Sequence, residues 1–199
     1  MGHAHRPGIR RAVFLDRDGT MAQYREYCCH PKDFRLLPGV GHAVRTLNHA
    51  GLAVIVMTNQ SAIARGWLTG DVLGQIHRKM RRALGRVGAR IDAIYVCPHH
   101  PDDGCACRKP GIAMFTQAAE ELGLSLASSY VVGDRMLDVL SGRAAGSQTI
   151  LVRSGHRPEP AHGVEPDYEA EDLTEAVAWI LQQERLQRGQ GSRCHAMAR

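Results

Sequence analysis

Two aspartates in the pattern Asp-x-Asp-Gly-Thr directly follow the apolar run 12–15. Asp16 could attack an electrophile and form a covalent intermediate, and Asp18 could give up and take back a proton. Both carboxylates, together with a phosphate, also suit Mg²⁺, which prefers oxygen ligands. An acid pair can instead cap a strand and begin a loop, so a catalytic role depends on partner groups elsewhere in the chain.

Groups that could handle a phosphoryl group follow three further apolar runs. Hydroxyls and amides that could bind its oxygens come after the second run, at Thr58, Asn59, Gln60 and Ser61. Lys109, which follows Arg108, could neutralise negative charge on a phosphoryl group and on a nucleophile. Asp134 and Asp138 follow the fourth run and could complete an acidic metal site, although acids also favour a helix N-terminus.

Three cysteines and two histidines lie within residues 97–107. Two closely spaced pairs supply three thiolates and one imidazole, namely Cys97 with His99 and Cys105 with Cys107. This donor set makes a closed, structural zinc site, and the paired spacing favours His99 over His100. A chance run of cysteines is the alternative, but in a reducing compartment clustered cysteines more often bind metal. We expect the zinc to fold this loop and to fix Arg108 and Lys109.

The elements that must position these groups alternate along the chain. Five short runs rich in Val and Ile lack polar alternation, which is typical of buried strands in a parallel sheet; they are residues 12–15, 52–58, 91–97, 130–132 and 149–152. Helical patterns span residues 40–50, 71–87, 112–122, 137–145 and 173–186. This order predicts a three-layer, Rossmann-like α/β domain with a parallel sheet. Ligands of such sheets bind at the carboxyl ends of the strands, where the groups above lie.

These motifs, in this order at successive strand ends, resemble the haloacid dehalogenase (HAD) superfamily of mainly phosphatases over about residues 12–153. The resemblance implies that Asp16 is the nucleophile, forming an aspartyl-phosphate. Asp18 would protonate the leaving alcohol and then activate water, while Thr58 and Lys109 would orient and neutralise the phosphoryl group. The implied Mg²⁺ site consists of Asp16, the backbone carbonyl of Asp18, and Asp134, with Asp138 behind them.

Many members of this superfamily carry a cap domain that selects the substrate. Here residues 21–39 form only a short flap, and one helix, one strand and the zinc loop take up residues 62–107, so the chain looks capless. Two capless families that carry such a zinc loop are similar, the heptose 1,7-bisphosphate phosphatases and the histidinol-phosphate phosphatases. Residues 58–66, 97–101, 105–110 and 151–155 resemble the heptose family, which has Gly where Ala62 stands.

The heptose likeness implies removal of the 7-phosphate of a heptose bisphosphate, in ADP- or GDP-heptose biosynthesis. Histidinol-phosphate hydrolysis in histidine biosynthesis is the alternative, which the Arg65-Gly66 run disfavours. A non-enzymatic phosphosugar-binding protein would be expected to have lost Asp16 or Asp18, and both are present.

The same likeness implies which residues contact the sugar bisphosphate: Arg17, Tyr24, Arg25, Tyr27, Asn59, Gln60, Ser61, Arg108 and Arg135. Arg108 would recognise the sugar end or its second phosphate. Family members usually have Lys where Arg135 stands, and this change keeps the charge but replaces a point donor by a planar fork.

Composition and charge limit the remaining classes of function. The chain has 199 residues, of which 44% are hydrophobic and 23% charged. This suits one globular domain, expected over residues 12–186 between a flexible tail (1–11) and a basic tail (187–199). Of the net charge of +5, seven positive charges come from arginines in residues 1–12 and 185–199, so residues 13–184 carry −2. A basic charge confined to the two ends disfavours a nucleic-acid 3′-phosphatase.

No apolar run approaches the ~20 residues of a membrane span, and residues 1–12 lack the pattern of a signal peptide. We therefore expect a cytoplasmic protein with no membrane partner. The position of the basic charge predicts no nucleic-acid partner, the motifs above imply Mg²⁺ and Zn²⁺ as cofactors, and a monomer is the default expectation.

Overall fold

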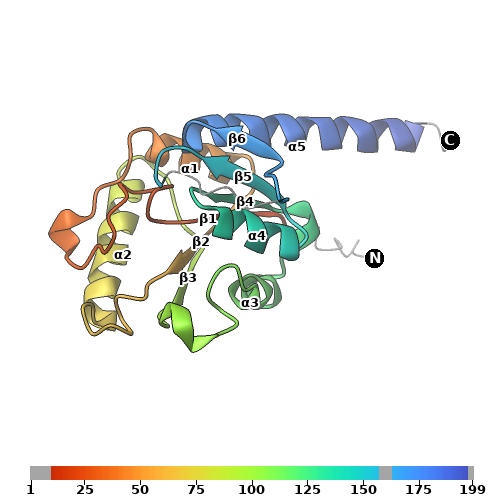
Figure 1. The fold of residues 1–199 in the computed structure, drawn as a ribbon. Helices are drawn as coiled ribbons and strands as arrows, with labels where there is room; N and C mark the ends of the chain where they lie inside the picture. The colour runs from red at the N-terminus through yellow and green to blue at the C-terminus, as the bar shows by residue number, and fades with distance from the viewer. Residues whose placement is uncertain (1–9, 157–162, 197–199) are drawn as a thin grey trace, which may run out of the picture.

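A six-stranded, wholly parallel sheet forms the centre of the chain (Figure 1). The computed structural model describes residues 10–156 and 163–196. The strand order is β3-β2-β1-β4-β5-β6. The strands are β1 (Ala12–Leu15), β2 (Ala53–Asn59), β3 (Ala93–Cys97), β4 (Tyr130–Gly133), β5 (Gln148–Val152) and β6 (Tyr168–Ala170).

Five α-helices cover the two faces of this sheet and make a three-layer domain (Figure 1). Side chains alternate along β1, so Val13 and Leu15 join the larger core and Phe14 joins the smaller one. The larger core is closed by α1 (Val40–His49), α2 (Gly70–Gly85) and α5 (Leu173–Ala196). On the other face lie α3 (Ala113–Leu122) and α4 (Met136–Ala144). The predicted Rossmann-like α/β class is confirmed.

The five predicted strands and five predicted helices are all present, but the edge strand β6 was not predicted. Strand β6 is only three residues long, Tyr-Glu-Ala, and Glu169 at its centre is exposed. Its place depends on pairing with β5, where Tyr168 stands opposite Ile150. A run this short has no apolar pattern that could identify it from sequence alone.

The chain ends differ from their predicted boundaries. Helix α5 continues to Ala196 (Figure 1), so the prediction that it stops at residue 186 is wrong. At the other end, Arg10 forms an isolated bridge with Leu124, and Arg11 pairs with buried Glu184 at 2.9 Å. Arg10 and Arg11, expected in the flexible tail, thus contact the rest of the domain.

The carboxyl ends of β1 and β4 mark the point where the strand order reverses. From β1 the chain proceeds to β2 and β3 on one side, and later to β4, β5 and β6 on the other. The backbone N–H of Asp16 donates to the carbonyl of Val132 at 2.9 Å, so the loops after β1 and β4 start side by side. Such a switch point is where open α/β sheets bind their ligands.

Only short segments surround this end of the sheet. The flap, residues 21–39, contains a single 3₁₀ turn (Pro31–Asp33) and is tied to α2 by Lys79, whose Nζ donates to the carbonyl of Pro31 at 2.6 Å. The zinc loop, residues 97–107, contains another 3₁₀ turn (Pro101–Asp103). Within the described residues no cap domain is inserted, which leaves the site open. None of the described helices is long and apolar enough to cross a bilayer.

Candidate active site

Lys109 holds together the two carboxylates nearest to it. Its Nζ donates to Asp16 Oδ1 at 2.6 Å and to Asp138 Oδ1 at 2.5 Å, and also to the carbonyl of Met57 at 2.8 Å. The side chain is 4% exposed. Burial by itself lowers the pKa of Lys109, but the carboxylates of Asp138 and Asp16 outweigh it and raise that pKa. The ammonium group therefore stays charged beside Asp16.

Three carboxylates converge beside this single lysine. One oxygen from each of Asp16, Asp134 and Asp138 lies within 4.8 Å of the others. Burial raises the pKa of Asp16 and of Asp134; Lys109 opposes the rise at Asp16, and the N–H of His156 opposes it at Asp134. The cluster thus carries more negative charge than Lys109 balances, a surplus that a divalent cation would neutralise.

Asp134 supplies a specific place for such a cation. It is fully buried, and its Oδ2 accepts a hydrogen bond from the N–H of His156 at 2.6 Å. Its Oδ1 has no hydrogen-bond partner among the described residues. An unpaired buried carboxylate oxygen is costly, and a hard cation that takes oxygen ligands would remove that cost.

Gly19 lets the first loop approach Asp134 closely. Its φ is +95°, and a Cβ placed there would lie 2.1 Å from Asp134 Oδ2. Only glycine combines this left-handed backbone with so close a contact. The Asp-x-Asp-Gly spacing therefore brings the loops after β1 and β4 together around one acidic centre.

Asp18 lies beside this centre in a network of donors. Gln60 Nε2 donates to Asp18 Oδ2 at 2.9 Å and also to Thr58 Oγ1 at 2.8 Å. Because Thr58 accepts from Gln60, its own hydroxyl proton remains free for a phosphoryl oxygen. Thr58 is 1% exposed at the end of β2, so this donor is preorganised.

A pocket of about 520 Å³ opens over these groups. Its lining includes twelve of the predicted catalytic and substrate-contacting residues: Asp16, Asp18, Tyr24, Arg25, Tyr27, Thr58, Asn59, Gln60, Ser61, Arg108, Lys109 and Arg135. The groups come from the flap, the ends of β1 and β2, the segment directly after the zinc loop and the start of α4. The structure thus brings segments far apart in sequence around one small hollow.

The side chain of Arg17 is the predicted substrate contact that does not line the pocket. It is fully buried behind Asp18, and its Nη2 lies 2.5 Å from Asp18 Oδ2. The expectation that this side chain contacts the substrate is therefore corrected. Its position between Asp16 and Asp18 in the sequence suggested the pocket, but the loop turns its guanidinium inward.

Asn59 lines the pocket and also ties the segment that follows the zinc loop to β2. Its Oδ1 accepts from the backbone N–H of Lys109 at 3.2 Å, and its Nδ2 donates to the Lys109 carbonyl at 3.3 Å. This pair of bonds fixes the backbone that carries the lysine. Asn59 is thus placed to hold Lys109 as well as to meet a substrate.

Among the pocket residues that were not predicted as site residues, Arg65 and His156 contact the aromatic rings of the flap. Arg65 lines the pocket, and its guanidinium carbon lies 5.2 Å from the ring centre of Trp67 and 5.9 Å from that of Tyr27. His156 lines the other side, with its ring 4.9 Å from that of Tyr24. These ring contacts fasten the first part of the flap, at Tyr24 and Tyr27. The Arg65-Gly66 run was noticed only as a family likeness, and no pattern marked His156.

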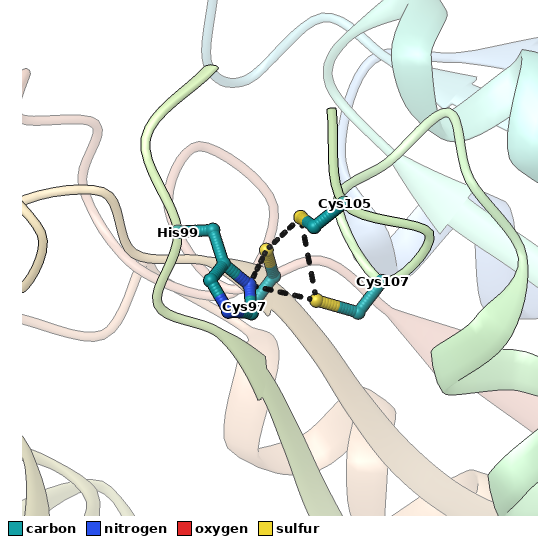
Figure 2. Close-up of side chains that lie close together, drawn as sticks. All are labelled: Cys97, His99, Cys105 and Cys107. Atoms are coloured by element: carbon teal, nitrogen blue, oxygen red, sulfur yellow. Dashed lines mark hydrogen bonds between the residues drawn. The ribbon is translucent and has the colours of Figure 1, made fainter. Parts of the chain in front are cut away.

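The predicted zinc ligands form a compact cluster (Figure 2). The Sγ atom of Cys97 lies 3.5 Å from that of Cys105, which lies 3.6 Å from that of Cys107. His99 Nδ1 lies 3.2 Å from Cys107 Sγ and 3.7 Å from Cys97 Sγ. Ligands at ~2.0–2.3 Å from one tetrahedral ion would be separated by comparable distances. His100 stays outside the cluster and accepts from the N–H of Asp102.

Comparison with known proteins agrees with this geometry. A family model described as HAD-hydrolase-like matches residues 106–176. A curated D-glycero-beta-D-manno-heptose-1,7-bisphosphate 7-phosphatase from Bordetella bronchiseptica is 38% identical, with 87% of this chain and 99% of that protein covered. A D-glycero-D-manno-heptose-1,7-bisphosphate 7-phosphatase from Thermosynechococcus vestitus is also 38% identical, over 86% of this chain and 95% of its own length.

A solved structure is similar over the same extent. The crystal structure of D,D-heptose 1,7-bisphosphate phosphatase from B. bronchiseptica, in complex with magnesium and phosphate, superposes with a TM-score of 0.80. It is 36% identical and covers 87% of this chain and 99% of its own. On the combined likeness of sequence, fold and site, this chain belongs to the D-glycero-D-manno-heptose-1,7-bisphosphate 7-phosphatase family of HAD-like hydrolases.

Proposed function

We propose that this chain is a Mg²⁺-dependent phosphatase that removes the 7-phosphate of D-glycero-D-manno-heptose 1,7-bisphosphate. The observation that carries the proposal is the buried contact of 2.6 Å between Asp16 and Lys109, at the floor of a pocket suited to a small ligand. The names of relatives that match nearly the whole domain support the substrate.

Magnesium fits the acidic centre by the chemistry of its donors. Asp16, the backbone carbonyl of Asp18, and Asp134 would hold it, and the unpaired Asp134 Oδ1 is one of the oxygens offered. Bound Mg²⁺ would neutralise the carboxylates and the substrate phosphate, so that a carboxylate and a phosphate can approach each other. Asp138 would stay behind it, since Lys109 already occupies its Oδ1.

The chain's own residues then divide the reaction into two steps. A carboxylate oxygen of Asp16 attacks phosphorus, the bond from phosphorus to the sugar oxygen breaks, and Asp18 gives its proton to that oxygen. In the second step Asp18 takes a proton from water, whose oxygen attacks phosphorus and releases Asp16 and inorganic phosphate. Lys109 and the Thr58 hydroxyl stabilise the charge on the phosphoryl oxygens in both steps.

The charge of the pocket favours a substrate with a second anionic end. Arginines 25, 65, 108 and 135 line it, and apart from Asp16, Asp18 and Asp138 of the acidic centre, Glu26 is the one acid in the lining. Arg108 Nη1 and Arg65 Nε are buried without hydrogen-bond partners among the described residues. A second phosphate would satisfy such donors, whereas histidinol phosphate presents an amine at its other end. The pocket is formed within one chain, and we expect a monomer to be active.

The direct test is Mg²⁺-dependent phosphate release from the α and β anomers of heptose 1,7-bisphosphate, with histidinol phosphate alongside. We expect release from a heptose anomer to exceed that from histidinol phosphate by more than about 100-fold, because the second phosphate contributes binding energy. Chelation of Mg²⁺ should abolish it. Release from histidinol phosphate alone would overturn the substrate assignment.

We propose also that Cys97, His99, Cys105 and Cys107 hold a structural zinc ion. Four protein ligands leave no open position, so the ion would fold the loop and take no part in the chemistry. The folded loop would hold Arg108 and Lys109 at the pocket, together with the two hydrogen bonds that Asn59 makes to the backbone of Lys109.

Substitution of one ligand tests this zinc site. Cys105→Ser should lose bound zinc, melt at a lower temperature and lose about tenfold or more in kcat/KM, because loop order is linked to metal binding. Cys29→Ser, in the flap, is the matched control and should keep all three properties. Metal analysis of the purified protein that finds no zinc, or a Cys105→Ser variant with full activity, would contradict the proposal.

A further inference from the structure

Arg17 connects Asp18 to helix α2. Its Nε donates to both oxygens of Asp18, at 3.0 and 3.1 Å, and its Nη2 donates to Oδ2 at 2.5 Å. On its other edge, Nη1 lies 3.3 Å from Nε2 of His77. Arg17 is 0% exposed, and neither Arg17 nor His77 lines the pocket. These contacts therefore do not serve the substrate directly.

A buried guanidinium fixes its partners because it is always charged and its donors point in a rigid fork. Two of its donors are occupied by Asp18, which Gln60 also holds from the other side at 2.9 Å. If Nη1 on the remaining edge had no acceptor, it would be an unsatisfied buried donor, which costs about 1–3 kcal/mol. Nε2 of His77 is positioned to be that acceptor.

The protonation state of His77 suits this role. Burial, reinforced by the nearby charge of Arg17, lowers its pKa to about 4, so the imidazole is neutral at physiological pH. A neutral ring can present a lone pair on Nε2, whereas a protonated ring would present a second donor to the guanidinium. The contact at 3.3 Å is then an Arg17-to-His77 hydrogen bond.

We propose that His77 is a positioning residue for the proton transfer: it orients Arg17, and Arg17 orients the carboxylate of Asp18 toward the leaving oxygen. This inference rests on the proposed role of Asp18 as acid and base. When Asp18 gives up its proton, the guanidinium of Arg17 stabilises the negative charge that forms on the carboxylate. Arg17 therefore aids the proton transfer as well as the orientation of Asp18.

The role predicts a particular dependence on the leaving group. Alkyl phosphates release a poor leaving group that needs the proton from Asp18, whereas activated aryl phosphates need little protonation. The value of kcat/KM reports the steps up to the first irreversible one, here release of the alcohol or phenol. His77→Leu should therefore lower kcat/KM for alkyl phosphates by about 10–100-fold and for p-nitrophenyl phosphate by less than about threefold.

The test is a plot of log kcat/KM against leaving-group pKa for a series of aryl and alkyl phosphates. The wild type, His77→Leu, His77→Gln and His49→Leu are compared, each with its melting temperature. We expect a steeper slope for His77→Leu alone, and near recovery in His77→Gln, whose amide oxygen can accept from Arg17. His49, exposed on α1, is the matched control.

Parallel plots for His77→Leu and wild type would overturn the inference, because a merely structural defect lowers kcat/KM for all substrates by the same factor. Equal impairment of His77→Gln and His77→Leu would also overturn it. The series contains no heptose, so this test does not depend on the proposed substrate. If that substrate is wrong, the wild type will not hydrolyse heptose bisphosphate, but the comparison of slopes remains valid.

Discussion

Asp16→Asn is expected to lower kcat by at least about 10⁴-fold, because the amide cannot form the acyl-phosphate on which both steps depend. The fold should survive. Burial raises the pKa of Asp16 above its ordinary 3.8, so the folded state binds this proton more tightly than the unfolded state does. Stability that depends on Asp16 therefore falls as pH rises above that ordinary value. An asparagine amide does not titrate in this range, so the variant should lack this loss of stability at higher pH.

Two measurements check the expectation for Asp16→Asn. Steady-state kinetics should show the loss of activity, and melting without divalent metal should show a smaller decrease between about pH 5 and pH 8 than the wild type. Asp71→Asn, an exposed position on α2, is the control for the loss of a carboxylate. A variant that keeps more than about 1% of kcat would contradict the nucleophile assignment.

Lys109→Met is expected to damage both activity and stability. The ammonium group neutralises Asp16 and Asp138 at 2.6 and 2.5 Å in a buried site. Its removal should lower kcat by about 10²–10³-fold or more. Because it also leaves two carboxylates without their shared cation, the free energy of unfolding should fall by about 3–5 kcal/mol.

A second substitution separates these two effects. Adding Asp138→Asn to Lys109→Met removes one of the stranded carboxylates, so the double variant should regain much of the stability and none of the activity. Lys32→Met, at an exposed lysine of the flap, should leave both quantities unchanged. A Lys109→Met variant with normal stability and activity would show that the contact has no role.

The acidic centre and Thr58 could be predicted because they stand at or directly after the ends of strands, and Lys109 because it follows the loop after β3. In a parallel sheet the carboxyl ends of strands meet at one edge, so Asp16, Thr58 and Asp134 had to come together once the strands were identified. The cluster of three cysteines and His99 was predictable for a similar reason. Its two ligand pairs flank one short loop, and their spacing alone restricts the possible arrangements.

Other features depend on packing that no local pattern records. Arg17 was placed in the pocket because its sequence neighbours are there, but its contact with His77 joins residues 60 positions apart. The place of His156 comes from a loop that returns to the site after β5, and the Tyr24 ring packs against it. The three residues of β6 are held mainly by their neighbour β5. Such contacts arise from the tertiary fold and leave little trace in hydrophobic periodicity.

The proposed function specifies which of the two phosphates of the substrate is removed. ³¹P NMR of heptose 1,7-bisphosphate, incubated with the protein and Mg²⁺, distinguishes the ester at carbon 7 from the anomeric phosphate at carbon 1. With the wild-type protein we expect the 7-phosphate signal to disappear, inorganic phosphate to appear in equal amount, and the 1-phosphate signal to persist. With Asp16→Asn both substrate signals should persist and no inorganic phosphate should appear. Loss of the 1-phosphate instead, or an unchanged spectrum with the wild type, would contradict the proposed function.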